Sequence, residues 1–571
     1  MSHIPPDARP EPDTVGRRSF LASLAAMGLG GTALWNAVQE GSEITKEMIS
    51  DAETLLGLDF TDQERELMLR DLSRNLARYE ALRSVGIPNG VQPAMMFDPV
   101  LPGREPKFRT GTSRPTRHPG VKRPENLEDV AFWSLTELGE LIRSRQASSV
   151  ELTRMYLDRL RRLGPKLECV ITLTEELALR QARRADRDLA RGLHRGPLHG
   201  IPWGAKDLLA EDEYRTTWGA KPVEEQVIDE DATVVRRLED AGAVLIAKLT
   251  LGALAMGDVW YGGQTRNPWK LDQGSSGSSA GSASATVAGL VGFSIGSETL
   301  GSIVSPSTRC GATGLRPTFG RVSRYGAMAL AWSMDKLGPI CRSAEDCALV
   351  FEAIHGADGK DQSARDLPFY WDPELSLSEL RIGYYRSAFE REDENYRWKE
   401  LDARALETVR SLGTDPIPVE LPDQFPVNAL RIILNAEAAA TFDQLTRDNR
   451  DDLLVRQGRG AWPNLFRQSR FIPAVEYIQA NRIRTMLMGA LEAALDGIDV
   501  FITPSYRPRV LLTTNLTGHP AVTLPHGFWE DGTPTSISFI GKLFGETELL
   551  TVAHAFQRAT DYHLQRPPEF S

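Results

Sequence analysis

The stretch "QGSSGSSAGSASATVAGLVGFSIGSETLGSIVSPS" runs from Gln273 to Ser307 and decides how the rest of the chain is interpreted. It is rich in serine and glycine, but apolar runs such as 287–291 interrupt it. A flexible linker would be polar throughout. A P-loop would need a lysine, and no Lys or Arg lies between Lys270 and Arg309. The pattern predicts a buried helix followed by a strand over residues 283–295.

A serine nucleophile within this stretch would need a base other than histidine. "GSSAG" (277–281) loosely matches the G-x-S-x-G nucleophile elbow, but none of the nine histidines lies in a matching motif. Lys206, in "GPLHGIPWGAKDLLA" (196–210), follows an apolar, strand-like segment. Burial lowers the pKa of a lysine, and the neutral amine can then accept a serine proton. Ser-Lys pairs are a known variant of the serine triad.

The composition excludes several classes of protein. The chain has 571 residues, 41% hydrophobic and 25% charged, with a net charge of −11. That charge argues against nucleic acid or an anionic membrane as the main partner. Four cysteines are too few for a disulfide scaffold and match no zinc pattern, although Cys341 and Cys347 could pair in an oxidising compartment. We therefore expect neither a metal nor a cofactor.

The first 40 residues have the layout of an address signal. Arg17 and Arg18 precede an apolar stretch over residues 20–35, which is too short and too rich in Gly and Ala for a good membrane span. This order resembles the twin-arginine export signal of bacteria. It predicts a periplasmic or exported protein, associated with a membrane only if the signal stays uncleaved. The alternative is a cytoplasmic arm with a chance arginine pair.

Residues 41–125 are predicted to form a helical segment followed by an extended arm. Residues 44–85 have helical periodicity, and Thr61-x-x-Glu64 is a capping box. Residues 86–125 are rich in Pro, Gly and Arg and show no period, so we expect an extended arm or linker there.

From residue 126 to residue 571, helical patterns alternate with apolar strands. Within 231–250, a helix precedes Gly242 and an apolar strand follows over 243–247. Residues 498–505 are predicted to form another buried strand. Further helices open with Ser134-x-x-Glu137 and Ser148-x-x-Glu151, the second ending before Gly164-Pro165. This alternation predicts an α/β fold in which helices cover a sheet.

Five blocks in this order and approximate spacing resemble the amidase signature family. They are "GIPWGAKD", "GSSAGSASATVAG", "GSETLGSI", "CGATGLRPTFGRVSRYG" (310–326) and "NLTGHPAVTLPHGFWEDGTPTSISFIGK" (515–542). The resemblance covers roughly residues 126–565 and implies the fold of that family, a large mixed central sheet with helices on both faces. It also implies an enzyme that hydrolyses or transfers amides with a Ser–cis-Ser–Lys triad.

Carried over by position, the triad is Lys206, Ser278 and Ser302. Ser302 is the expected nucleophile, Ser278 the bridging serine on a cis peptide bond after Gly277, and Lys206 the base. The family relay passes the proton of the nucleophile through Ser278 to neutral Lys206, and an acyl-enzyme forms on Ser302. Ser279 is expected to support this network. The backbone N–H groups of Thr299, Leu300, Gly301 and Ser302 are expected to form the oxyanion hole.

The sequence departs from the family at three positions around the nucleophile. Glu298 stands for an Asp, Leu300 for a Gly, and Val304 for an Arg. A positive φ at Leu300 would be strained. A buried carboxylate at position 298 needs a partner, and we expect Arg309 to supply it.

Several functions fit the resemblance or compete with it. The main expectation is an amidase that acts on a small-molecule amide and that could form a homodimer. The same fold would also serve the glutaminase subunit of a tRNA-dependent amidotransferase, or an esterase or carbamate hydrolase. An inactive descendant and a periplasmic binding or scaffold module are the remaining alternatives.

The acyl pocket is expected outside the signature blocks. Candidate segments are 255–262, Trp332, and the region 435–480 with its aromatic residues Trp462, Phe466, Phe471 and Tyr477. Aromatic side chains there favour an apolar or aryl substrate, although core packing is the commoner reason for aromatics.

Overall fold

The computed structural model describes residues 44–106, 108–391, 397–505 and 507–571. The predicted export signal over residues 1–40 lies outside the described residues. The chain divides into two compact units, Met1–Ile87 and Pro88–Ser571. Among the described residues, no helix combines the length and apolar character needed to cross a membrane.

The described residues of the first unit form two helices, α3 (Lys46–Leu56) and α4 (Asp62–Arg83). The predicted capping box opens α4: the backbone N–H of Thr61 donates to the Glu64 carboxylate at 2.6 Å, and the Glu64 N–H donates to the Thr61 hydroxyl at 3.3 Å. The described residues between 86 and 125 form neither helix nor strand, as the sequence predicts for an arm.

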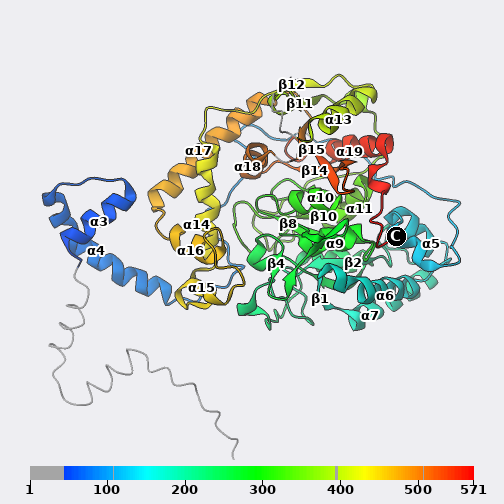
Figure 1. Cartoon of the computed structure of the whole chain (residues 1–571), viewed down its shortest axis with the longest axis horizontal. Helices are drawn as coiled ribbons and strands as arrows, with labels where there is room; N and C mark the ends of the chain where they lie inside the picture. The colour runs from blue at the N-terminus through cyan, green and yellow to red at the C-terminus, as the bar shows by residue number, and fades with distance from the viewer. Residues whose placement is uncertain (1–43, 107, 392–396, 506) are drawn as a thin grey trace, which may run out of the picture. The chain divides into compact units, whose positions relative to one another are not determined.

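The second unit is built on one mixed sheet of eleven strands (Figure 1). Their order across the sheet is β1-β3-β2-β8-β10-β9-β14-β15-β13-β11-β12. Strand β2 pairs in parallel with β3 and β8, whereas β10 and β14 pair with their neighbours antiparallel. The strands are β1 (Val170–Leu173), β2 (Pro202–Lys206), β3 (Val244–Leu249), β8 (Phe293–Glu298), β9 (Thr313–Arg316), β10 (Lys336–Cys341), β11 (Ile382–Tyr385), β12 (Ile417–Val419), β13 (Val500–Pro504), β14 (Ala521–Phe528) and β15 (Pro534–Gly541).

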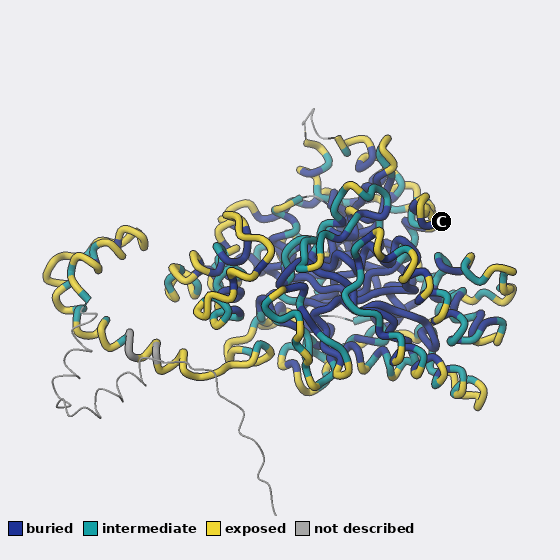
Figure 2. The backbone as a smooth tube through the Cα atoms, turned by 60° about the horizontal axis from the view of Figure 1, so that its bottom comes forward, coloured by how far each residue is buried: buried dark blue, intermediate teal, exposed yellow. Residues whose placement is uncertain are grey.

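Helices pack on this sheet in the α/β arrangement that the sequence predicts. Helices α9 and α10 pack on each other and on central strands, as do α11 and α19, and the backbone is buried most completely at the centre of this unit (Figure 2). Two small hairpin sheets are separate from the central sheet: β4 (Val259–Trp260) pairs with β5 (Gly263–Gln264), and β6 (Arg266–Asn267) pairs with β7 (Lys270–Gly274). The helices are α5 (Leu135–Arg143), α6 (Ser149–Leu167), α7 (Glu175–Ala190), α8 (Thr233–Asp240), α9 (Ala280–Val287), α10 (Val304–Cys310), α11 (Ala344–Ile354), α12 (Arg386–Phe389), α13 (Lys399–Ser411), α14 (Ile432–Thr441), α15 (Asp443–Arg447), α16 (Trp462–Ser469), α17 (Ala474–Ala494), α18 (Pro508–Thr517) and α19 (Glu546–Thr560).

The structure confirms the predicted start of α6 but not its predicted end. Its capping box, Ser148 with Glu151, forms as expected. The prediction that the helix ends before Pro165 is wrong, because α6 continues to Leu167. A proline in the last turn removes a single N–H donor, and Leu167 is fully buried, so core packing holds that turn in place.

The end of β2 is held by a buried ion pair. Asp207 follows the last residue of β2, and its carboxylate lies 2.9 Å from the ammonium of Lys248 on β3, with both side chains fully buried. The same carboxylate accepts hydrogen bonds from the N–H and the hydroxyl of Thr217, at 2.8 and 2.6 Å. These contacts fix the point at which the chain leaves β2, directly after Lys206.

We predict that Lys248→Met destabilises the protein by about 3–5 kcal/mol, because it leaves the buried Asp207 carboxylate without its charge partner. Urea unfolding followed by circular dichroism measures this change. Lys166→Met is the control, since its pair with Glu569 is exposed and should contribute little. Equal effects of the two substitutions would contradict the prediction.

Candidate active site

Lys206 lies at the end of β2 and is completely buried. Its Nζ lies 2.8 Å from the Ser278 hydroxyl, 2.8 Å from the Ser297 hydroxyl and 3.0 Å from the Ser279 hydroxyl. Burial lowers the pKa of this amine well below its ordinary value, and the opposing charges of Asp335 and Glu298 only partly offset that effect. A neutral amine has a lone pair that accepts a hydroxyl proton, which a charged ammonium lacks.

Ser278 lies two residues before helix α9, whose N-cap is Ser279, and is 1% exposed. A cis peptide bond joins it to Gly277, as the family resemblance implies. A Cβ at position 277 would lie 1.9 Å from the backbone oxygen of Gly257, so only glycine fits there. The two expected partners in proton transfer, Lys206 and Ser278, are thus in direct hydrogen-bond contact.

Ser302 lies in the turn between β8 and α10, and it is 9% exposed. The N–H of Ser279 donates to the Ser302 backbone oxygen at 3.1 Å. The Ser279 hydroxyl also donates to the Ser297 carbonyl and accepts from the Ser297 N–H, both at 3.1 Å. Among the hydrogen bonds of the described residues, Ser302 therefore joins the network through its backbone, and Ser279 is the link. Catalytic hydrogen bonds are often loose without substrate.

The turn from Thr299 to Ser302 was expected to supply the oxyanion hole. Within the described residues its left-handed position is Gly301, with φ 87°, and not Leu300, so the expected strain at Leu300 does not arise. Leu300 instead packs partly buried against an apolar cluster that includes Met334. The Thr299 hydroxyl donates to the Asp335 carboxylate at 2.6 Å, which ties the start of the turn to the loop before β10.

The prediction that Arg309 pairs with Glu298 is wrong. Arg309 is exposed and donates to Gln273 at 3.2 Å. The partner of Glu298 is Arg316 on β9, at 2.8 Å, and both side chains are fully buried. Glu298 ends strand β8 and Arg316 ends strand β9. These two strands flank β10 in the sheet, so the sheet order brings the two side chains together.

Glu298 holds the nucleophile turn together. One of its oxygens accepts the N–H groups of Ile303 and Val304, at 2.9 and 3.0 Å, and the other accepts from Arg316 and Asn515, each at 2.8 Å. Burial alone would raise the pKa of this carboxyl, but the charge of Arg316 and these hydrogen bonds lower it to about 2. Glu298 is therefore charged throughout the neutral range.

A cavity of about 580 Å³ reaches this network at Ser297 and Thr299. Of the expected pocket residues, Ala255 and Trp332 line it. Much of the remaining lining is apolar or aromatic: Leu208, Trp218, Ile228, Tyr325, Ala327, Met328, Leu330 and Leu337.

The aromatic residues expected in the region 435–480 do not line this cavity. Trp462 and Phe466 are buried and stack on each other with ring centroids 5.0 Å apart. Phe471 is 66% exposed, and Tyr477 donates to Glu437 at 3.0 Å. Core packing thus accounts for the two stacked rings.

The described residues include one cluster with the spacing of metal ligands. The carboxylates of Glu211, Asp212 and Glu213 lie within 4.8 Å of one another, but Asp212 and Glu213 are exposed. Such exposed acidic groups are common without a metal. All four cysteines are buried and free, including Cys341 and Cys347.

Comparison with known proteins identifies the relatives of this chain. The sequence profile of the family described as Amidase matches residues 151–550. A curated relative, the A subunit of the glutamyl-tRNA(Gln) amidotransferase of Moorella thermoacetica, is 34% identical over 485 residues, covering 77% of this chain and 99% of that protein. The corresponding protein from Methylococcus capsulatus is 35% identical over 483 residues, covering 76% and 98%.

The similar solved structures include both a peptide amidase and an amidotransferase subunit. The native peptide amidase of Stenotrophomonas maltophilia superposes with a TM-score of 0.68 at 30% identity, over 78% of this chain and all of that one. The A subunit of the glutamyl-tRNA(Gln) amidotransferase of Thermotoga maritima superposes with a TM-score of 0.65 at 26% identity, over 77% and 97%.

We predict that Glu298→Gln lowers the free energy of unfolding at pH 7 by at least about 3 kcal/mol, from the gap between a folded pKa of about 2 and an unfolded value of about 4.3. The folded pKa is depressed, so this stabilisation is present above the unfolded value and is lost as pH falls toward 2. Urea unfolding at pH 7 and at acidic pH measures the difference between wild type and variant, which should narrow in acid. The prediction would be contradicted if wild type and variant had the same free energy of unfolding at pH 7, or if their difference did not depend on pH. Glu407→Gln, at an exposed carboxylate, is the control.

Proposed function

The chain belongs to the amidase family, and we propose that it cleaves a small-molecule carboxylic amide through an acyl-enzyme on Ser302. The observation that carries the proposal is the fully buried Lys206, whose amine lies 2.8 Å from the Ser278 hydroxyl. A base that is uncharged near neutral pH is what a serine nucleophile without a histidine requires.

In the proposed first step, the Ser302 hydroxyl attacks the amide carbonyl carbon. Its proton passes to the Ser278 oxygen, while the Ser278 proton passes to the Lys206 amine. The negative charge on the carbonyl oxygen is met by backbone N–H groups of the turn from Thr299 to Ser302. Loss of one such donor typically costs about 10²–10³ in rate.

In the proposed second step, the relay runs in reverse. Lys206 returns a proton through Ser278 to the leaving nitrogen, and the carbon–nitrogen bond breaks. Water then attacks the ester on Ser302 and gives a proton to the same relay. The bond between the acyl carbon and the Ser302 oxygen breaks, the relay returns that proton to the Ser302 oxygen, and the carboxylic acid leaves. No net proton stays on the enzyme, so the relay is ready for another cycle.

The glutaminase subunit of a tRNA-dependent amidotransferase is the second candidate. The observation in its favour is that curated relatives named as amidotransferase subunits are 34–35% identical over 98–99% of their own length. The same three residues would then release ammonia from glutamine for a partner subunit. From the sequence of residues 1–40 alone, we propose that the chain is exported by the twin-arginine route. An exported protein would be separated from a cytoplasmic partner subunit, and this favours the stand-alone amidase.

We predict that Ser302→Ala and Lys206→Ala each lower amide hydrolysis at neutral pH by at least about 10³-fold, because each removes one end of the relay. The measurement is a hydrolysis screen of aryl amides, fatty amides, peptide amides, glutamine, carbamates and esters. Arg309→Ala, an exposed substitution near the turn, is the control and should retain activity. Full activity in Ser302→Ala would refute the assignment.

The same screen separates the two candidates. A stand-alone amidase should turn over one of the amides other than glutamine fastest. If glutamine is the best substrate, and a partner subunit raises its turnover, the amidotransferase candidate replaces the amidase. A preference for carbamates or esters would keep the acyl-enzyme and change the substrate class.

A further inference from the structure

The segment Pro88–Gln92, called the strap below, contributes five consecutive residues to the wall of the cavity. It lies far outside residues 151–550, which match the family. The same cavity is also lined by Ser297 and Thr299, next to the proposed catalytic residues. The wall of the cavity therefore includes a segment that lies outside the family match.

Two side-chain amides hold the strap in place. The Ala329 N–H donates to the Asn89 side-chain oxygen at 2.7 Å, and the Asn89 side-chain NH₂ donates to the Ala329 carbonyl at 3.3 Å. The side-chain NH₂ of Gln92 donates to the Asp361 carboxylate at 2.9 Å. Asn89 and Gln92 are half-buried, whereas Pro88, Gly90 and Val91 are exposed. Apolar packing thus contributes little to the position of the strap.

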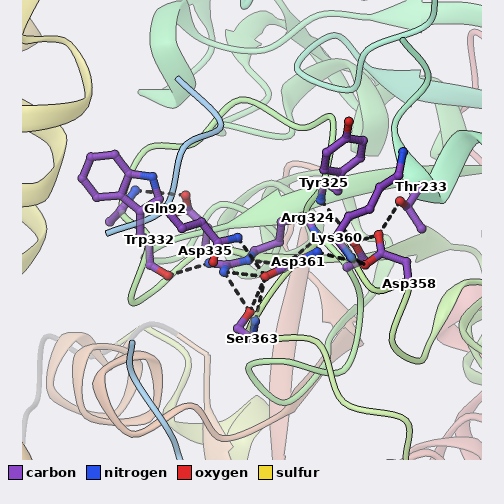
Figure 3. Close-up of polar contacts among 12 residues, drawn as sticks. Gln92, Thr233, Arg324, Tyr325, Trp332, Asp335, Asp358, Lys360, Asp361 and Ser363 are labelled. Carbon is purple, nitrogen blue, oxygen red and sulfur yellow. Dashed lines mark hydrogen bonds and ion pairs between the residues drawn. The ribbon is translucent and has the colours of Figure 1, made fainter. Parts of the chain in front are cut away.

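The anchor point at Asp361 belongs to a network of ion-pair and hydrogen-bond contacts. Asp361 is fully buried, and its carboxylate lies 2.9 Å from Nε of Arg324, whose guanidinium also donates to the Trp332 carbonyl at 2.6 Å (Figure 3). The strap is hydrogen-bonded to this network through Gln92.

The other anchor connects the strap to the proposed oxyanion turn. Ala329 is followed by Leu330 and Ala331, whose N–H groups donate to the Asp335 carboxylate at 2.8 and 2.9 Å. The other oxygen of Asp335 accepts the Thr299 hydroxyl at 2.6 Å. One loop therefore bonds to the strap at one end and to the turn before Ser302 at the other.

We propose that the strap is the specificity-determining wall of this cavity, which limits the length of the acyl group and excludes longer chains. The inference rests on the proposed function, because it assumes that the acyl group occupies the cavity. A volume of about 580 Å³ is typical of sites that enclose a small organic molecule. The lining combines aromatic and aliphatic side chains with the charged residues Glu230, Arg324, Asp335 and Lys360, so the strap limits the length of the acyl group rather than its polarity.

The test removes both anchors at once in the full chain, as Asn89→Ala with Gln92→Ala, and repeats each substitution alone. Substrates are the straight-chain primary amides from butanamide to dodecanamide. The measured quantity is the ratio of kcat/KM for dodecanamide to that for butanamide. Arg104→Ala is the matched control, since it lies on the same arm but does not line the cavity. Thermal unfolding verifies that each variant is folded.

We expect the double variant to raise this ratio at least about tenfold, which corresponds to burying roughly two further methylene groups. The single variants should raise it less, and Arg104→Ala should leave it unchanged. An unchanged ratio in a folded double variant, or an equal change in the control, would overturn the proposal. A uniform loss for all amides would also overturn it, since that is the result of a merely structural role.

A binding measurement separates this proposal from the proposed function. The same amides are titrated calorimetrically into Ser302→Ala, with and without the two strap substitutions. If the strap substitutions remove the preference for binding short amides, the result supports the proposed role of the strap. It does so even if the wild type hydrolyses none of these amides, an outcome that would contradict only the proposed function. An unchanged preference overturns the strap whatever the turnover.

Discussion

The arrangement of the site depends on the burial of one amine. Lys206 is held out of water at the end of a central strand and is surrounded by the hydroxyls of Ser278, Ser279 and Ser297. Hydroxyls can hydrogen-bond to either form of the amine but do not offset the loss of hydration that a charged ammonium would suffer. The surroundings therefore favour the form of lysine that can accept a proton, and the serine-rich sequence has a physical reason.

The carboxylate of Glu298 is a second buried ionisable group close to this site, since Glu298 directly follows Ser297 on β8. It is kept charged by Arg316 and by hydrogen bonds from the turn that carries Ser302. The pKa of one buried group is thus shifted toward its neutral form while the other group is held charged, and the difference lies in their partners. Asp207 with Lys248 forms a second compensated pair beside Lys206. Lys336 on β10, in register with Glu298, is a second buried lysine whose pKa is lowered well below its ordinary value by burial. Lys206 differs from it in its partners, which are the three serine hydroxyls.

Much of the fold and the candidate site follows from local sequence patterns. The capping boxes at Ser134 and Ser148 form as expected. The ordered motif blocks point to Lys206 and Ser278, which lie in hydrogen-bond contact, and to Ser302, whose role as nucleophile stays a prediction. These signals succeed because a cap depends on residues three apart, and a motif carries its residues as a unit.

Other features depend on contacts between distant parts of the chain. The partner of Glu298 is Arg316 rather than Arg309, because sheet order and not proximity in sequence decides the pairing. Nothing periodic marks Pro88–Gln92, so its place at the cavity is visible only in the folded chain. Likewise, the burial of Leu167 carries α6 past Pro165, although a proline usually signals a helix end.

The central claim concerns the protonation of one side chain, and nuclear magnetic resonance can observe it directly. Lysine labelled with ¹³C at the ε carbon gives one signal per lysine, and a Lys206→Met variant assigns the signal of Lys206. We predict that this signal titrates far below the ordinary lysine value of about 10.4, so that the amine is uncharged near neutral pH. A titration at the ordinary value would contradict the account.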